Sequence, residues 1–405
     1  MRQFQKRFAN FNLPQIAMKK GIYPFYHAIE SGQDTVVKIK GKDILMFGSN
    51  SYLGLTNHPE LIETATNALR KYGTGASGSR LMNGNLDLHV ELENKLAEFV
   101  VKPAATVFST GFQANIGTIS SVVGKNDYVI LDEKNHASII EGSRLTFAKS
   151  LKFKHNDMAS LEKVLQRIET NAIKLIVVDG VFSMEGDVVK LDQICDLADK
   201  YNASVMVDDA HALGVLGKQG SGTASHFEKT EKTDLIMGTF SKSLASLGGF
   251  VAGDFDTINF IKHKARSLLF SASIPPASAA TVIKAIEIIQ KEPERRYRLW
   301  ANADYARKCL KQENFELGDS STPIIPIFIG EETRTYIYSS MLLENGIYVN
   351  PIVHPAVAKG QAILRFSLMA THTKEQIDKA VETLVKCRAI LEHNTVPHNL
   401  EYEKP

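Results

Sequence analysis

Short apolar runs alternate with amphipathic segments along most of the chain, from about residue 46 to residue 286. The runs at 127–132, 174–179 and 204–208 predict buried strands, because a strand covered on both faces is apolar at nearly every position. The segments 158–168 and 191–201 repeat their apolar residues at helical spacing and predict helices. This alternation predicts an α/β fold, with a large domain built on a mostly parallel sheet that helices cover.

The pattern changes in the last third of the chain. A long helical stretch at 277–312, interrupted near Pro293, follows the alternating region. It leads into predicted strands at 322–329 and 362–367 and a closing helix at 374–391. These elements predict a small C-terminal α/β domain.

The first segment of the chain predicts an arm, with a helix followed by a short hairpin around Gly41 and Lys42. The last dozen residues are polar and predict a mobile tail. We therefore expect an N-terminal arm at 1–45, a large domain at 46–286, and a small domain with the tail at 287–405.

Composition is that of an ordinary soluble globular protein, with 405 residues, 44% hydrophobic and 23% charged. A formal net charge of +2 gives no reason to expect a nucleic-acid partner. The chain has no zinc-type Cys/His cluster, no apolar run of membrane-spanning length and no signal-peptide stretch at its start. Cys195, Cys309 and Cys387 are widely spaced in helix-like segments, which predicts free thiols in a reducing cytosol.

Lys242 has an unusual setting for a lysine. It lies among hydroxyl-bearing and small apolar residues in the segment 238–250, between two predicted strands. Burial penalises the ammonium form, and a neutral amine is a nucleophile suited to a Schiff base with an aldehyde or ketone. Most lysines are solvated surface residues, so this residue alone leaves both interpretations open.

Two other segments end apolar runs with polar groups. The predicted strand at 204–208 ends in Asp208, Asp209, Ala210 and His211, at the edge of a parallel sheet where ligands bind. A carboxylate there can hold the ring nitrogen of pyridoxal phosphate (PLP) protonated, which makes the ring an electron sink. Alternatively, the aspartate caps the next turn.

The segment 108–117 turns from a short apolar run through Ser, Thr and Gly into a predicted helix. Free backbone N–H groups at such a helix start bind phosphate, although an N-cap without a ligand has the same pattern. Neither a GxGxxG nor a GxxxxGK[ST] pattern follows a strand here, so dinucleotide and P-loop sites have little support.

Together these segments resemble the α-oxoamine synthase family of fold-type I PLP enzymes, from about residue 47 to residue 373. The matching motifs occur in the family's order. They are SNSYLGL at 49–55, GTGASGSR at 73–80, NHASI at 135–139, DGVFSMEGD at 179–187, DDAH at 208–211, GTFSKSLASLGG at 238–249 and LRFS at 364–367.

The resemblance implies a role for each residue around the cofactor ring. Lys242 would hold PLP covalently and, once the amino acid displaces it, act as the base at Cα. Asp208 would pair with the ring nitrogen. His211, with help from Ser183, would hydrogen-bond the phenolic oxygen. His136 would stack on the ring face, and its alternative role is that of a loop histidine that caps the following helix.

The resemblance also implies a phosphate site and a dimer. Gly111 and Phe112 would offer backbone N–H groups to the phosphate, and Thr239 and Ser241 would add hydroxyls. Ser271 matches a position that reaches the phosphate of the neighbouring subunit. The active site would therefore lie at the interface of a homodimer.

The implied substrate contacts involve both predicted domains. Arg365 would bind the substrate carboxylate in a bidentate pair, unless it is a surface arginine of an edge strand. Asn50 matches a residue near the same carboxylate, and Ser77 and Ser79 lie where the family accommodates the amino-acid side chain. Some members carry a second arginine where this chain has Val353, His354 and Pro355, so carboxylate binding would depend more on Arg365.

Family members condense an amino acid with an acyl-CoA thioester and release CO2 and CoA. The segments 78–89, 240–249 and 367–373 are most similar to the bacterial members that condense L-serine with palmitoyl-CoA to 3-ketodihydrosphingosine. We therefore expect L-serine and a long-chain acyl-CoA as substrates. The alternatives are a member that uses glycine, alanine or threonine with another acyl-CoA, or a non-catalytic partner subunit.

The N-terminal arm combines apolar and basic residues at near-helical spacing. They are Phe4, Phe8 and Phe11 beside Arg2, Lys6 and Arg7. Packing of the apolar face across the dimer is one interpretation. Peripheral docking on an anionic inner membrane is the other.

Overall fold

The computed structural model describes residues 2–9, 11–168 and 171–393. Contacts between Cα atoms divide the chain into two compact units. The sheet unit comprises Asn50–Ser183 and Asp187–Leu299, and the terminal unit comprises Met1–Ser49, Met184–Gly186 and Trp300–Pro405. The predicted arm and the predicted small C-terminal domain therefore belong largely to one unit.

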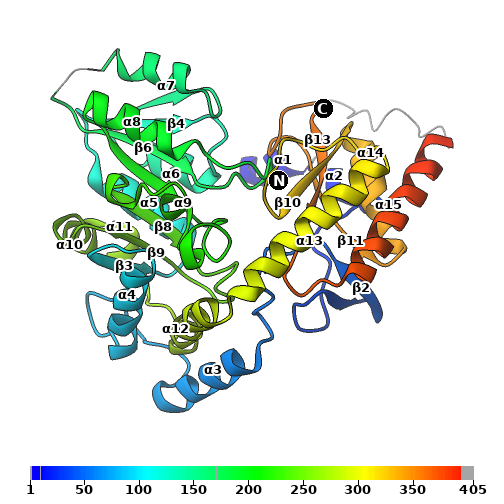
Figure 1. Cartoon of the computed structure of the whole chain (residues 1–405), viewed down its shortest axis with the longest axis horizontal. Helices are drawn as coiled ribbons and strands as arrows, with labels where there is room; N and C mark the ends of the chain where they lie inside the picture. The colour runs from blue at the N-terminus through cyan, green and yellow to red at the C-terminus, as the bar shows by residue number, and fades with distance from the viewer. Residues whose placement is uncertain (1, 10, 169–170, 394–405) are drawn as a thin grey trace. The chain divides into compact units, whose positions relative to one another are not determined.

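The sheet unit is built on a seven-stranded sheet in the order β3-β9-β8-β7-β6-β4-β5 (Figure 1). Its strands are β3 Ala104–Phe108, β4 Tyr128–Asp132, β5 Lys149–Phe153, β6 Lys174–Asp179, β7 Ser204–Asp208, β8 Leu235–Thr239 and β9 Gly249–Gly253. Among these strands, β9 runs in the direction opposite to the other six. Every residue of β6 is buried, as expected for a central strand covered on both faces.

Helices connect the strands of the sheet unit. They are α3 Pro59–Tyr72, α4 Asp87–Phe99, α5 Gly111–Val122, α6 Ala137–Arg144, α7 Met158–Leu165, α8 Leu191–Tyr201, α9 Thr223–His226, α10 Phe255–Lys264, α11 Arg266–Leu269 and α12 Pro276–Lys291, with short 3-10 turns at Lys218–Gly220 and Thr230–Lys232. One apolar core joins Ala114 and Ile119 of α5 and Ile139 of α6 to alternate residues of the strands. This packing fixes the start of α5 against the sheet.

The terminal unit contains two small sheets. In one, β1 Val36–Ile39 and β2 Lys42–Met46 form a hairpin, and β11 Ile347–Tyr348 pairs parallel to β2. Lys40 and Gly41 connect the hairpin with φ values of 51° and 73°, which is the left-handed conformation of a two-residue turn. In the other, the antiparallel order is β10 Ile324–Gly330, β13 Ala362–Ser367 and β12 Asn350–Ile352.

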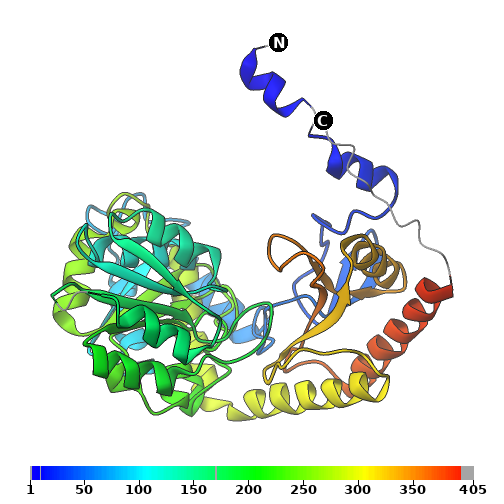
Figure 2. The ribbon, with the colours of Figure 1, turned by 90° about the horizontal axis from the view of Figure 1, so that it is seen from above.

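Helices complete the terminal unit. They are α1 Gln3–Phe8, α2 Leu13–Lys19, α14 Glu332–Glu344 and α15 Lys374–His393, and α13 Pro293–Gln312 enters the unit at Trp300. Phe47 stacks between Phe366 and His372 at ring distances of 4.4 and 4.3 Å, and so joins the end of the hairpin to the C-terminal strands. Figure 2 shows α1 and α2 extending away from the sheets of this unit.

Most predicted elements are confirmed within one or two residues at each end. The predicted helix at 158–168 ends earlier, at Leu165. The stretch at 277–312 consists of α12 and α13, which meet at Pro293 as expected. The arm contains two short helices instead of one, and the predicted tail lies outside the described residues.

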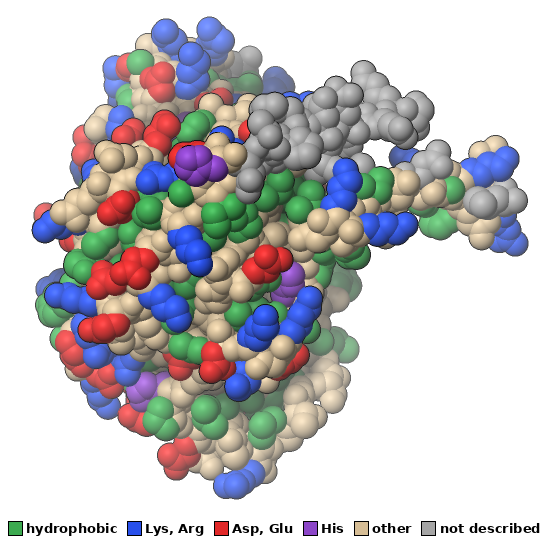
Figure 3. All heavy atoms as spheres, turned by 90° about the vertical axis from the view of Figure 1, so that its right-hand side faces the viewer, with side chains coloured by type: hydrophobic (Ala, Val, Ile, Leu, Met, Phe, Trp, Pro, Cys, Tyr) green, Lys and Arg blue, Asp and Glu red, His purple; other side chains and the backbone are tan. Residues whose placement is uncertain are grey.

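The three cysteines are free thiols, with Cys195 and Cys387 buried. On the face drawn in Figure 3, basic and acidic side chains are interspersed, in agreement with the small net charge. Within the described residues, no helix has the length and apolarity needed to cross a bilayer, and no three His, Cys, Asp or Glu side chains are grouped to hold a metal ion.

Candidate active site

The predicted site residues follow the carboxyl ends of parallel strands. β3, β4, β6, β7 and β8 run in the same direction, so their carboxyl ends lie along one edge of the sheet. The residues that follow these ends are Gly111 and Phe112 after β3, His136 after β4, Ser183 after β6, His211 after β7, and Ser241 and Lys242 after β8. The topology of the sheet thus brings segments that are distant in the sequence to one edge.

The N-terminus of α5 offers two backbone N–H groups. Thr110 caps this helix, because its side chain accepts a hydrogen bond from the N–H of Gln113 at 3.1 Å. The first backbone bond of the helix joins the Ala114 N–H to the Thr110 carbonyl, also at 3.1 Å. The N–H groups of Gly111 and Phe112 precede that bond and point out of the helix end, where the helix dipole favours an anion.

Two glycines allow the sheet to approach this helix end closely. A Cβ atom at Gly111 would lie 2.8 Å from Thr239 Oγ1, and one at Gly249 would lie 2.6 Å from the Cα of Gly111. Thr239 Oγ1 lies 3.1 Å from Ser241 Oγ. Two hydroxyl groups therefore join the two N–H groups in a cradle suited to a phosphate.

Lys242 lies in a tight loop between β8 and β9. Backbone bonds from Phe240 N to Gly248 O at 3.0 Å and from Ser246 N to Phe240 O at 2.9 Å close the loop. The buried side chain of Leu244 anchors it. Lys242 itself is half-buried, and its electrostatic neighbours include His136 and Asp179. The amine is thus held at the sheet edge, close to polar groups from two other strand ends.

Two buried aspartates end adjacent strands. Asp208 is only 3% exposed, and its carboxylate accepts hydrogen bonds from Asn115 Nδ2 at 2.6 Å and from the Ala210 N–H at 2.9 Å. Asp179 is its direct neighbour in the register of β6 and β7. Burial raises the pKa of Asp179 well above its usual value, and the charge of Asp208 raises it further. Two buried carboxyl groups therefore lie side by side at the ends of β6 and β7.

His136 caps the helix that follows it, which is one of its two predicted roles. It is the N-cap of α6, and its Nδ1 lies 3.3 Å from the Ser138 N–H and 2.7 Å from Ser138 Oγ. Its own N–H donates to Asp179 Oδ2 at 2.8 Å. Burial lowers the pKa of His136, and the Lys242 charge adds to this effect against the opposing charge of Asp208. The ring is therefore neutral at neutral pH and lies at the same sheet edge as Lys242.

His211 is joined to the SNSYLGL motif. Its Nδ1 lies 2.6 Å from the hydroxyl of Tyr52, which is fully buried. The same hydroxyl lies 3.4 Å from Asn50 Oδ1. The structure thus brings Asn50, Tyr52 and His211 together, although the two segments are more than 150 residues apart.

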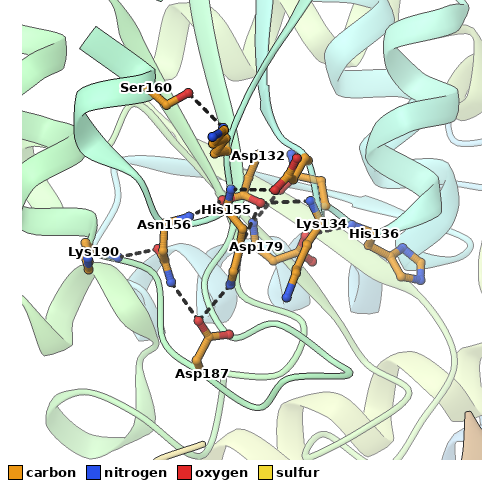
Figure 4. Close-up of polar contacts among 12 residues, drawn as sticks. Asp132, Lys134, His136, His155, Asn156, Ser160, Asp179, Asp187 and Lys190 are labelled. Atoms are coloured by element: carbon orange, nitrogen blue, oxygen red, sulfur yellow. Dashed lines mark hydrogen bonds and ion pairs between the residues drawn. The ribbon is translucent and has the colours of Figure 1, made fainter. Parts of the chain in front are cut away.

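A charged histidine connects the loop that carries His136 to the loop after β6 (Figure 4). His155 Nδ1 donates to Asp132 Oδ1 at 3.0 Å, and Nε2 donates to Asp187 Oδ2 at 2.9 Å. Burial alone would lower the pKa of His155, but the hydrogen bonds to the two aspartates raise it to about 9. In Figure 4, the His136 ring points away from this cluster. The cluster therefore supports the loop on the side opposite to the ring.

The remaining predicted serines lie in three loops. Ser271 Oγ accepts a hydrogen bond from Gln113 Nε2 at 3.2 Å, which places it beside the start of α5 in its own chain. The segment of Ser77 and Ser79 adjoins the loop after Ser271, because Gly78 O accepts from the Ser273 N–H at 3.0 Å. Ser183 is half-buried in the loop after β6.

Arg365 belongs to the terminal unit, in the central strand of its antiparallel sheet. The residue is 4% exposed, and its Nη1 donates to Ser367 Oγ at 2.7 Å. The alternative of a surface arginine in an edge strand is therefore wrong.

Sequence reasoning missed the polar side chains that support these residues. Asn115 lies within the segment 108–117 but was given no role, and it is fully buried against Asp208. The available signal was the position of Asn115. It lies one helical turn after Gly111, on the face of α5 that points toward the sheet, where a polar residue is unusual. Asp209 was also missed as a support: burial raises its pKa to about 7, and its Oδ2 accepts from the Thr223 N–H at 2.9 Å.

The donor set at this edge fits PLP. A half-buried amine can bond an aldehyde carbon, and the helix end with its neighbouring hydroxyls can bind a phosphate. A buried carboxylate can hold a protonated ring nitrogen. The two glycines let Thr239 and the start of β9 pack closely against this helix end.

Comparisons with known proteins agree with this chemistry. A family model for aminotransferase class I and II matches residues 42–384. A serine palmitoyltransferase from Sphingobacterium spiritivorum is 55% identical over 384 residues, which cover 95% of this chain and 96% of that protein. An 8-amino-7-oxononanoate synthase from Alkaliphilus metalliredigens is 44% identical over 367 residues, covering 90% and 93%.

Solved structures have the same fold. A serine palmitoyltransferase from S. paucimobilis with a bound PLP–myriocin aldimine is 34% identical and has a TM-score of 0.93, covering 96% of this chain and 100% of that chain. This chain therefore belongs to the aminotransferase class I and II family of PLP-dependent enzymes, and within it to the α-oxoamine synthases. Within that group it is similar to the bacterial serine palmitoyltransferases, and it is a PLP-dependent acyltransferase. The predicted family, fold, cofactor and enzyme class are thus confirmed.

The His155 cluster predicts a distinct pH dependence of stability. The folded state holds a proton on His155 up to a pKa of about 9, whereas the unfolded state releases it near the ordinary histidine pKa of 6.5. The stabilisation is therefore complete below pH 6.5 and is lost as the pH rises through 9. The stability difference between the wild type and His155→Gln should shrink by about 3 kcal/mol across this range.

Urea unfolding followed by circular dichroism at pH 6 to 10 measures this difference. His263→Gln, which changes an exposed histidine of α10, is the control and should give a constant offset. Parallel stability curves for the wild type and His155→Gln would show that His155 is not charged in the folded state.

Proposed function

We propose that this enzyme condenses L-serine with palmitoyl-CoA to 3-ketodihydrosphingosine, with release of CoA and CO2, as the first step of sphingolipid synthesis. The observation that carries this proposal is 55% identity to a serine palmitoyltransferase across 95% of the chain. The 8-amino-7-oxononanoate synthases are the second candidates, because members of that group are 44–46% identical.

Lys242 would hold the cofactor and then move a proton. Bound PLP supplies an electron sink that stabilises negative charge at the amino-acid Cα. Lys242 Nζ would hold the aldehyde carbon until the substrate amine replaces it, and would then accept the Cα proton. Its closed loop between β8 and β9 supports both roles, because it fixes the amine at the sheet edge.

Three other side chains would orient the ring. The buried Asp208 would accept a hydrogen bond from the protonated ring nitrogen. His136 would stack on one face of the ring. His211 would hydrogen-bond the phenolic oxygen, with Ser183 nearby, and Tyr52 would fix the orientation of the His211 ring through the 2.6 Å contact.

The phosphate would lie at the start of α5. The N–H groups of Gly111 and Phe112 and the hydroxyls of Thr239 and Ser241 would bind its oxygens. Ser271 of a second copy would complete the site, so the active enzyme would be a homodimer. Within one chain, the contact with Gln113 places Ser271 beside the start of α5.

The substrate carboxylate would pair with Arg365, with Asn50 close to it. A guanidinium that is 4% exposed has little competition from water for a bidentate pair. Ser77 and Ser79 would line the space of the serine side chain, where a hydroxyl can satisfy the substrate hydroxyl. A new bond would form between the serine Cα and the thioester carbonyl carbon as CoA leaves as a thiolate, and the carboxyl group would then leave as CO2.

The arm is proposed to be covered in the working enzyme. Phe4, Phe8 and Phe11 are 77%, 53% and 68% exposed, and the basic residues beside them are also exposed. We propose a cytoplasmic enzyme in which a second copy of the chain covers this apolar edge. Contact with the anionic inner face of a membrane, where the long-chain product must finally go, is the alternative.

Lys242→Ala should reduce turnover by about a thousandfold or more, because it removes both the covalent anchor and the base. Lys264→Ala, which changes an exposed lysine of α10, should leave turnover unchanged. Product formation by mass spectrometry and the visible absorption of bound PLP measure the effect. Near-normal product formation by Lys242→Ala would contradict the proposed role.

A panel of amino acids and acyl-CoAs tests the substrates. Serine should react at least about tenfold faster than alanine or glycine, because a buried hydroxyl-binding group left unpaired is costly. Palmitoyl-CoA should exceed acetyl- and succinyl-CoA, since each buried CH2 contributes about 0.8 kcal/mol. Faster reaction of glycine with a short acyl-CoA, or of alanine with another acyl-CoA, would replace the substrate assignment and leave the PLP chemistry intact.

Substitution of Phe4, Phe8 and Phe11 by Ala distinguishes the two proposed partners of the arm. If a second copy covers the arm, the triple variant should dissociate at higher protein concentration than the wild type in analytical ultracentrifugation. In this case we expect little protein to sediment with anionic vesicles, and the wild type and the triple variant should sediment to the same extent. Salt-sensitive vesicle binding by the wild type, abolished in the variant, would instead support the membrane contact.

A further inference from the structure

Asn115 is a fully buried polar residue that contacts two strand-end segments. It lies on α5, one helical turn after Gly111, and its side chain is 0% exposed. Its Nδ2 lies 2.6 Å from Asp208 Oδ2 and 2.8 Å from Ser138 Oγ. Asp208 ends β7 and Ser138 lies in the first turn of α6, so one amide group spans the ring-nitrogen and ring-face sides of the candidate site.

The direction of these hydrogen bonds follows from the chemistry of an amide. The amide nitrogen can only donate, so Asp208 Oδ2 and Ser138 Oγ both act as acceptors. The opposite orientation of the amide would place its oxygen against the carboxylate of Asp208, which is repulsive. In the observed orientation, Asn115 Oδ1 is buried and has no hydrogen-bond partner among the described residues. Leaving a buried oxygen unpaired has a free-energy cost that the charge-assisted bond to Asp208 must offset.

The bond to Ser138 also determines which nitrogen of His136 carries the proton. Because Ser138 Oγ accepts from Asn115, its own hydrogen is free to donate to His136 Nδ1 at 2.7 Å. The Ser138 N–H also points at this nitrogen, at 3.3 Å. With two donors toward it, Nδ1 is an acceptor, and the proton of the neutral ring lies on Nε2. Asn115 thus acts on His136 through Ser138.

The bond to Asp208 selects between two buried carboxyl groups. Asp208 and Asp179 are neighbours in the sheet, and two adjacent carboxylates cannot both be ionised at low cost. Asn115 donates to Asp208, whereas the donor to Asp179 is the backbone N–H of His136. A charge-assisted bond stabilises the ionised form of the group that receives it, so Asn115 favours the charge on Asp208.

We propose that Asn115 is a positioning residue that keeps the negative charge on Asp208 and, through Ser138, sets the proton of His136 on Nε2. This inference rests on the proposed function, in which these two residues contact the PLP ring. Asn115 contacts neither the reacting atoms nor the substrate in this assignment. Its effect is on the ring: it keeps Asp208 able to hold the proton on the ring nitrogen.

The first test uses PLP labelled with 15N in its ring. Asn115→Ala removes both donors, and the 15N signal of the bound ring should move toward that of an unprotonated pyridine. Turnover should fall by about ten- to a hundredfold, as expected for loss of a hydrogen bond to a charged group, while KM for serine changes by less than about threefold. Thr118→Val is the matched control, because Thr118 is equally buried on α5 and its hydroxyl has no partner among the described residues.

A second variant covers the case in which Asn115→Ala does not fold. Asn115→Leu keeps a similar side-chain volume and removes the donor without adding a titratable group, so it should give the same direction of 15N shift. Unchanged 15N signals and turnover in the variant that folds, or equal losses in Thr118→Val, would overturn the inference. A wild type that binds no PLP or forms no product with any amino acid would instead overturn the proposed function.

A double-mutant cycle tests the connection to His136. If Asn115 acts on the ring of His136 through Ser138, then Ser138→Ala and Asn115→Ala should share part of their effect. The double variant should lose less turnover than the product of the two single losses. Fully multiplicative losses would show that the two residues act independently and would overturn this part of the proposal.

Discussion

The arrangement of this sheet edge depends on one buried carboxyl group, that of Asp208, whose residue is only 3% exposed. Burying a carboxylate costs several kcal/mol unless hydrogen-bond donors surround it. Its donors come from two sides, the amide of Asn115 on α5 and the backbone of Ala210 in the loop after β7. Asp179 lies beside it in the sheet, and burial and the charge of Asp208 both raise the pKa of Asp179. The carboxyl group of Asp179 accepts a hydrogen bond from the backbone N–H of His136.

The fold brings the ends of separate strands, and the polar groups that follow them, to one edge of the sheet. A parallel sheet places the ends of β6, β7 and β8 side by side, and each following loop supplies one type of group: hydroxyl, carboxylate or amine. Loops alone would not hold such groups in place, so each has its own support. Glycine contacts fix the start of α5 against β8 and β9, backbone bonds close the Lys242 loop, and His155 holds the loop before His136.

The sequence predicts those parts of the molecule that depend on local pattern. The apolar runs of β4, β6 and β7 identify the central strands, and Asp208 and Lys242 stand out because polar residues interrupt apolar surroundings. The antiparallel direction of β9 is not visible in its sequence, because it depends on how the Lys242 loop closes. The bond between Asn115 and Asp208 joins residues 93 positions apart, and His155 bridges partners 23 and 32 positions away. Such pairings depend on the tertiary fold, which local patterns do not encode.

The composition of the terminal unit has a consequence for biosynthesis. Its hairpin strand β2 pairs with β11, and Leu45 lies opposite Ile347, about 300 residues later. The whole sheet unit is encoded between these two strands, so it leaves the ribosome while one edge of the hairpin still lacks its neighbour. At about 5–20 residues per second, this interval lasts roughly 15–60 s. During that time Phe47, which later stacks on Phe366 and His372, has neither partner, so the nascent chain exposes an aromatic residue and an unpaired strand edge until its C-terminal third is made.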